Sequence, residues 1–150
     1  MTKEHLIAVT HEQRLGAGEG LSKLRLALMR GLYLLNFISL AIDNWIIIFF
    51  PQEQMDILSG VAISFWASFS LLMLIGIRFP TRMLPLLLLQ LLYKSSWIIG
   101  TYLPAKSTGL LDANLQSFFW VCIAGIVLNL FIIPWPYVYH RYLKDFFKLR

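Results

Sequence analysis

Four continuous apolar stretches, each about twenty residues long, limit what this chain can fold into. They cover residues 31–50, 58–77, 83–102 and 115–134. Their hydrophobic residues run on without the alternation of a membrane barrel, so each stretch predicts a transmembrane helix. Because the connections between the stretches are short, neighbouring helices are expected to run antiparallel. The sequence therefore predicts an all-α fold, a four-helix transmembrane bundle with short loops.

The composition indicates that lipid is the solvent for most of the chain. Hydrophobic residues make up 58% of the 150 residues, against ~45–50% in soluble domains, and charged residues only 14%. We expect one transmembrane domain, residues 26–136, between a polar cytoplasmic arm (1–25) and a cytoplasmic tail (137–150). The net charge of +5 could indicate a nucleic-acid partner. No nucleic acid is expected as a partner, because the basic residues flank the apolar stretches and form no separate domain.

The lysines and arginines are distributed unevenly about these stretches. Eleven of the thirteen fall on one side of the predicted membrane: Lys3, Arg14, Lys23, Arg25, Arg30, Arg78, Arg82, Arg141, Lys144, Lys148 and Arg150. The opposite side has Lys106, and Lys94 lies within the third stretch. Since cytoplasmic loops are enriched in Lys and Arg, the pattern predicts a multi-pass protein of the cytoplasmic (inner) membrane with both termini in the cytoplasm.

The tail at 137–150 predicts an amphipathic helix after Pro134 and Pro136 end the fourth stretch. Its apolar residues recur at helical spacing: Tyr139, Tyr142, Leu143, Phe146 and Phe147. Basic residues occupy the remaining positions, which is typical of a helix that lies in the headgroup layer and binds anionic membrane lipid. The alternative is an ordinary flank of a membrane helix without a function of its own.

Two ionisable residues fall inside the apolar stretches at similar predicted depths. Asp43 and Lys94 lie roughly 10 and 12 Å inside the outer ends of the first and third stretches, by helix rise. Either charge alone would cost ~2.5–3.5 kcal/mol on insertion scales. We therefore predict an Asp43–Lys94 ion pair, or a shared water-filled pocket. The pair could bind a ligand or a proton, or it could be a structural clamp that fixes the register of two helices.

Polar and small residues recur at helical spacing on every stretch and predict an inward-facing polar centre. The first stretch has Asn36, Ser39 and Asp43; the second has Gly60, Ser64 and Ser68; the third has Gln90, Tyr93, Lys94 and Trp97; the fourth has Cys122, Gly125 and Asn129. The outer half of each stretch also has one tryptophan: Trp45, Trp66, Trp97 and Trp120. They form either an interfacial aromatic belt or the wall of an outer-facing pocket around Asp43, Asn44 and Lys94.

The stretches "RMLPLLLLQLLYKSSWIIGTYLP", "GVAISFWASFSLLMLIGIRFP" and "IIPWPYVYH" resemble uncharacterised small bacterial four-helix integral membrane proteins, whose architecture is loosely similar to that of DoxX-like proteins. The resemblance covers most of residues 30–140. It implies the fold and a membrane location and brings no activity with it.

Three hypotheses about function follow from the sequence. In the first, the chain is a non-enzymatic membrane protein that binds or passes a small ligand in the outer-facing pocket, as a homo-oligomer or with a partner. In the second, it is an accessory or assembly subunit of a larger membrane complex, and the charge pair is purely structural. In the third, it is a membrane enzyme acting on a lipid or a quinone. We expect no catalytic residue, metal or cofactor, since the stretches contain no histidine and no base beside a nucleophile.

Overall fold

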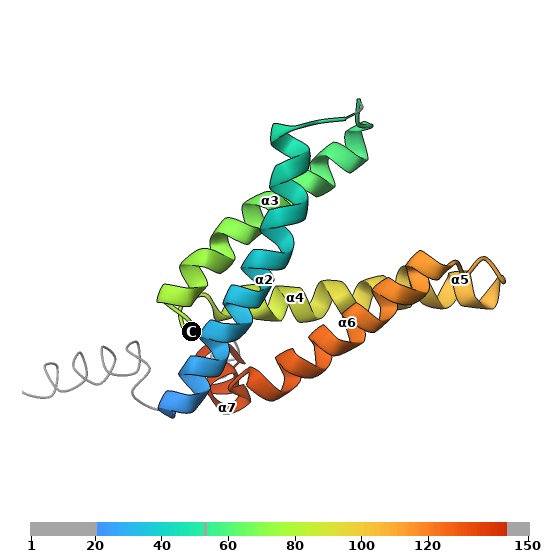
Figure 1. Cartoon of the computed structure of the whole chain (residues 1–150). Helices are drawn as coiled ribbons and strands as arrows, with labels where there is room; N and C mark the ends of the chain where they lie inside the picture. The colour runs from blue at the N-terminus through green and yellow to red at the C-terminus, as the bar shows by residue number, and fades with distance from the viewer. Residues whose placement is uncertain (1–20, 53, 144–150) are drawn as a thin grey trace, which may run out of the picture. The chain divides into compact units, whose positions relative to one another are not determined.

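The structure, a computed structural model, describes residues 21–52 and 54–143, and these ranges contain helices and turns without a strand. Four long helices follow one another (Figure 1): α2 (Lys23–Phe49), α3 (Ile57–Arg78), a third from Leu84 to Ser107, and α6 (Ala113–Ile132). All four are long and apolar enough to cross a membrane. The expected all-α fold with four membrane helices is confirmed, and the chain is a multi-pass membrane protein.

Two compact units make up the chain, Met1–Leu84 with α2 and α3, and Pro85–Arg150 with the remaining helices. The division falls at the start of the third long helix. Each unit is a pair of long helices that run antiparallel, as the short connections between them predict.

The first unit is held together by one face of α2 packed against α3. The buried residues of α2 recur at helical spacing: Met29, Leu32, Tyr33 and Asn36. Gly76 of α3 lies against the Tyr33 ring, and a Cβ at Gly76 would be 2.8 Å from Tyr33 Cγ. The Tyr33 hydroxyl then donates a 3.0 Å hydrogen bond to the Pro80 carbonyl. Tyr33 therefore ties α2 to both α3 and the turn that follows it.

The α3 face that packs differs from the one that the spacing of small residues predicts. Ser64 and Ser68 are exposed, whereas the buried residues of α3 are Ala67, Phe69, Ser70, Met73 and Gly76. In lipid, two helices are stabilised mainly by close packing. The preferred face is therefore one where small residues let the backbones approach and large side chains fill the remaining space. The line through Ser70 and Gly76 provides this contact to α2.

Three helices begin at a polar side chain that accepts a backbone hydrogen bond. Ser22 accepts from Arg25 N (3.2 Å), Asp56 from Leu58 N (2.9 Å), and Asp112 from Leu115 N (2.7 Å). These caps satisfy amide groups that have no partner within the helix. The connection after α2 thus ends at Asp56, and the connection before α6 ends at Asp112.

The third helix runs further than the sequence predicts, and Pro104 does not end it. Ordinary α-helix, α4 (Leu84–Trp97), passes into one π-helical turn, η1 (Ile98–Tyr102), and then into α5 (Leu103–Ser107). In this turn Leu103 N donates to Ile98 O, five residues back. A proline has no amide hydrogen and clashes with the carbonyl four residues earlier, and a widened turn relieves that conflict. The predicted loop after residue 102 therefore begins only at Thr108.

In the second unit, α6 contacts the third helix at η1, and the two helices diverge from there toward α7 (Trp135–Val138) in Figure 1. Tyr102 fixes this contact, because its ring stacks on Phe119 at 4.0 Å and its hydroxyl donates to Gln116 Oε1 at 2.9 Å. Nearer α7 the two helices meet through side chains, Lys94 against Gly125 and Gln90 with Asn129.

The predicted break at the end of the fourth stretch is confirmed. α6 ends at Ile132, Ile133 has extended backbone, and Pro134 precedes α7 and the π-turn η2 (Tyr139–Leu143). Pro136 lies inside α7, so Pro134 alone follows the end of the fourth stretch. Tyr139 and Arg141 are exposed there, while Val138 is buried. Residues 1–20 and 144–150 lie outside the described residues, so the amphipathic helix through Phe146 and Phe147, like most of the polar arm, stays a prediction.

Candidate functional site: a buried lysine between two helices

Polar and small side chains of α4 and α6 meet in the middle of the second unit and form what we call the polar interface: Gln90, Lys94, Cys122, Gly125 and Asn129. Gln90 and Lys94 are one turn apart on α4, and Cys122, Gly125 and Asn129 share one face of α6. Gln90, Lys94, Cys122 and Asn129 are all buried. Tyr93 and Trp97, the other members of the stripe predicted on the third stretch, are half-buried; that the stripes line a shared polar centre stays a prediction.

Lys94 lies at the centre of the polar interface, with only 6% of its surface exposed. Its aliphatic chain crosses Gly125 so closely that a Cβ there would be 2.9 Å from Lys94 Cε, and closer still to Nζ. The ammonium also lies 5.6 Å from the centroid of the Tyr93 ring, within the range of a cation–π contact. Gly125 thus makes room for a lysine that any other residue would displace.

The Lys94 ammonium has no carboxylate partner among the described residues of its own unit. The one acidic residue described there, Asp112, is exposed and caps α6 with its side chain. A lysine within a membrane helix costs ~2.5–3.5 kcal/mol on insertion scales when its charge is unmatched. A hydrogen bond or a charge from outside the unit would offset that cost.

Asn129, one turn along α6 from Gly125, leaves an acceptor unused in the same interface. Its Nδ2 donates to Gln90 Oε1 (3.2 Å) and to Gly125 O (2.8 Å), while its Oδ1 is buried without a hydrogen-bond partner among the described residues. An unsatisfied buried acceptor costs about 1–3 kcal/mol. The interface therefore contains a strong donor, Lys94 of α4, and an unused acceptor, Asn129 of α6, one turn from the Gly125 that Lys94 contacts.

The first unit contains the acid that the sequence pairs with Lys94. Asp43 is exposed on α2 and makes no hydrogen bond or ion pair with the described residues of its unit. Its neighbour Asn44 instead donates to Leu40 O at 2.7 Å, and Asn36, which is buried, donates to Leu32 O at 2.8 Å. Because Asp43 and Lys94 belong to different units, their ion pair stays a prediction.

The four tryptophans of the predicted aromatic wall have different surroundings. Trp45 Nε1 donates to Ser70 Oγ at 3.1 Å within the first unit, where Trp66 packs edge-to-face on Phe69. In the second unit Trp97 packs edge-to-face on Phe118 with centroids 4.7 Å apart. Trp120 is 61% exposed. Trp45, Trp66 and Trp97 therefore take part in packing within a unit, and Trp120 faces outward; whether they share a pocket stays a prediction.

Ser70 is a polar residue at a packed position that the sequence did not single out. Its hydroxyl accepts from Trp45 and donates to Ala67 O at 2.6 Å. It lies two residues beyond Ser68, on the line of α3 that contains Gly76. A search for small residues spaced to match the large side chains of α2 would have found it.

In the part of the chain that the structure describes, no three His, Cys, Asp or Glu side chains come together as metal ligands would. Comparison of the chain with protein-family models, with curated proteins and with solved structures found no match.

Proposed function

We propose that this chain is a non-enzymatic protein of the cytoplasmic membrane, with both termini in the cytoplasm, that binds or passes a small ligand at a site centred on Lys94 and open toward the outer face. A negatively charged or hydrogen-bond-accepting group would suit the ammonium best, and Asp43 would share the site. Membrane lipid surrounds the helices, and a second copy or a larger complex covers part of their exposed apolar surface.

The observation that carries this proposal is the buried Lys94 charge without an acid in the described part of its unit. Gly125 provides the space for it, and Asn129 Oδ1 provides an unused acceptor one turn away. A ligand with both an acidic and a donor group would satisfy both side chains. Ionisable residues within membrane helices are functional candidates by default, because their insertion cost must be compensated.

Asp43 and Lys94 would still lie at a similar depth in the membrane when the depth is counted from the nearest preceding basic residue, Arg30 or Arg82. The third helix extends to Ser107, so Lys94 is deeper from the outer end than the sequence predicts. Asp43 comes thirteen residues after Arg30, and Lys94 twelve after Arg82. At the rise of an α-helix these separations are roughly 20 and 18 Å. The two charges would then lie at one height in the membrane.

The second candidate function is that of an assembly subunit in which Asp43 and Lys94 form a structural clamp. Its support is that each charge has no partner among the described residues of its own unit. An ion pair across the two units would neutralise both charges and fix the register of the helices.

Native mass spectrometry from a mild detergent tests the ligand proposal. The wild-type protein should retain a small-molecule adduct that Lys94→Met lacks, while the two proteins have the same helicity and stoichiometry. Lys106→Met is the matched control, because it removes an exposed lysine near the end of the third helix by the same change. The same adducts on all three proteins, or none on any of them, would refute ligand binding at Lys94.

Protein levels separate the clamp from the ligand site. If the pair is structural, Lys94→Met and Asp43→Asn should each lower the amount of folded protein in the membrane, and the double variant should restore it. If Lys94 serves a ligand, the single variants should insert at normal levels and only the adduct should change. Purification of a stable partner together with the chain would favour the assembly subunit.

A further inference from the structure

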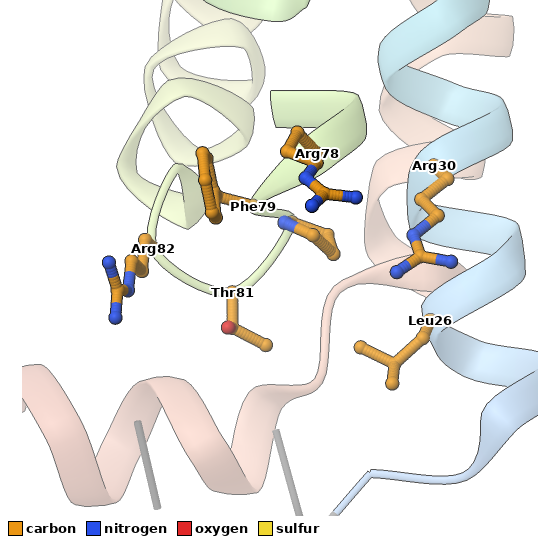
Figure 2. A pocket seen from close by; sticks show the side chains of 7 residues that line it. Leu26, Arg30, Arg78, Phe79, Thr81 and Arg82 are labelled. Carbon is orange, nitrogen blue, oxygen red and sulfur yellow. The ribbon is translucent and has the colours of Figure 1, made fainter. Parts of the chain in front are cut away.

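Three arginines line a pocket at the end of the first unit where α3 turns toward the third helix. The pocket has a volume of about 180 Å³. Arg30 comes from α2, Arg78 from the last turn of α3, and Arg82 from the turn that follows; Leu26, Phe79, Pro80 and Thr81 complete the lining. Figure 2 shows the guanidinium groups of Arg30 and Arg78 directed toward one another from two helices.

The three positive charges have no acid near them in the described part of the first unit. Asp43 lies thirteen residues along α2 from Arg30, and Asp56 lies twenty-two residues before Arg78. At helix rise these separations are roughly 20 and 33 Å. Two guanidinium groups that face one another repel unless an anion lies between them. The described residues of the unit therefore supply no counter-ion, and the pocket has the charge to bind one.

The lining of the pocket fits an oxyanion such as a phosphate group better than a bare halide. Guanidinium groups bind phosphate oxygens in pairs, as a planar fork of donors. Thr81, which is only 7% exposed, also lines the pocket and carries a hydroxyl group. The volume is below the ~300–1,000 Å³ of pockets for drug-sized ligands, which suits a phosphate and little more.

Apolar side chains beside the arginines indicate what the phosphate is attached to. Phe79 is 44% exposed, and the Arg82 guanidinium lies 5.6 Å from its ring centroid. Leu26 lies below Arg30 on the opposite wall (Figure 2). A phosphate with an acyl chain could place its charge between Arg30 and Arg78 and its chain along these residues and the apolar helix faces.

We propose that the pocket lined by Arg30, Arg78 and Arg82 binds a phosphate group, with the headgroup of an anionic phospholipid as its source. This site lies wholly in the first unit, and it depends on neither Lys94 nor the ligand proposed above. A rival explanation is that the arginines only set the orientation of the helices by their charge. That role requires positive charge and is filled equally well by lysine.

The test measures binding of phosphatidic acid to the full-length protein in mild detergent, by native mass spectrometry, with phosphatidylcholine and inorganic phosphate as the comparison probes. The Arg30→Lys/Arg78→Lys variant keeps both charges and loses the paired donors. It should bind phosphatidic acid at least about tenfold more weakly, because each ammonium makes a single contact where the guanidinium makes two paired ones. Lys23→Gln, which removes a charge on the same helix outside the pocket, should bind like the wild type.

Each arm of the experiment has a defined meaning. Binding of phosphatidic acid with little binding of inorganic phosphate identifies the lipid as the source, and equal binding of both identifies a free phosphate site. Unchanged binding by the double lysine variant, an equal loss in Lys23→Gln, or no binding of either probe overturns the proposal. If the double variant fails to fold, Arg30→Lys and Arg78→Lys are measured singly, and each should lose part of the affinity.

Discussion

Gly125 of α6 lies directly against the Lys94 side chain of α4, and no side chain larger than hydrogen fits at that position without moving the lysine. The backbone at Gly125 is ordinary α-helix, so glycine is needed there for the space it leaves and not for its conformation. The contact places Lys94, the one buried lysine among the described residues, at a defined point between two helices. The proposed function depends on that placement.

Gly125→Ala should therefore move the Lys94 ammonium while leaving the fold intact. The atoms that a new Cβ would meet are Nζ, Cε and Cδ, the flexible end of the side chain. A side-chain torsion pushed ~30° away from its rotamer costs about 0.5–1.5 kcal/mol. We expect a small drop in stability against SDS denaturation together with a loss of the small-molecule adduct. Gly100→Ala, where nothing lies within 4 Å of the new Cβ, is the control and should keep the adduct.

Gly76→Ala should destabilise the first unit more strongly. Here the new Cβ meets the root of the Tyr33 ring, whose position is fixed by burial and by the hydrogen bond to Pro80. Overpacking of this kind costs about 1–3 kcal/mol. Gly60→Ala on the same helix meets nothing within 4 Å and should be neutral or stabilising. Equal unfolding curves for the two variants would refute the role of the Tyr33–Gly76 contact.

The hydrogen bond between Asn129 and Gln90 should give a measurable coupling across the second unit. The two side chains join α4 to α6 where the helices have begun to diverge. Interhelical hydrogen bonds in membranes average about 0.6 kcal/mol in double-mutant cycles. Gln90→Leu, Asn129→Leu and the double variant should give a coupling of that size by SDS titration. Strictly additive effects would mean that the bond contributes nothing to the packing of the unit.

The start of α3 should loosen in acid because Asp56 caps it as a carboxylate. The Ser59 hydroxyl and then the Ser59 amide hold the pKa of Asp56 below its ordinary value of 3.8. Since the pKa is lower in the folded state, the cap stabilises fully above pH 3.8, and this stability is lost as the pH falls through the lowered pKa.

Hydrogen exchange of the Leu58 and Ser59 amides measures this effect. Their protection should fall in acid in the wild type and stay level in Asp56→Asn, which keeps a capping oxygen without a titrating group. Identical pH profiles in the two proteins would show that the charge of Asp56 is not involved.

The apolar stretches were enough to predict four helices and most of their ends, because a bilayer leaves a twenty-residue apolar segment few alternatives to a helix. The same reasoning found the polar stripes of α4 and α6, since Gln90, Lys94, Cys122 and Asn129 recur at helical spacing. It failed at two ends, because α2 begins at Lys23 rather than at residue 31, and the third helix continues past residue 102 to Ser107. The π-turn at Ile98–Tyr102 depends on how one proline is accommodated, and residue spacing contains no signal for that.

The packing of α3 and the arginine pocket were missed for a related reason. The spacing of Ser64 and Ser68 is typical of a face that packs on another helix. The position of Tyr33 on α2 decides which face of α3 is used, and the spacing of residues on one helix does not specify its partner. Arg30, Arg78 and Arg82 were counted only as charges that set orientation. That two of them face one another depends on the packing of α2 against α3, which brings Arg30 beside Arg78 in space.

Cysteine crosslinking between positions 43 and 94 tests the central claim most directly, that the Lys94 charge is met by Asp43 or by a site the two share. In a Cys122→Ala background, Asp43→Cys/Lys94→Cys should react with a short thiol-bridging reagent in native membranes to give an intramolecular product. Asp43→Cys/Lys106→Cys, which pairs the same position with the far end of the third helix, should not. Crosslinking of the control pair alone, or of neither pair while both cysteines react singly, would contradict this claim.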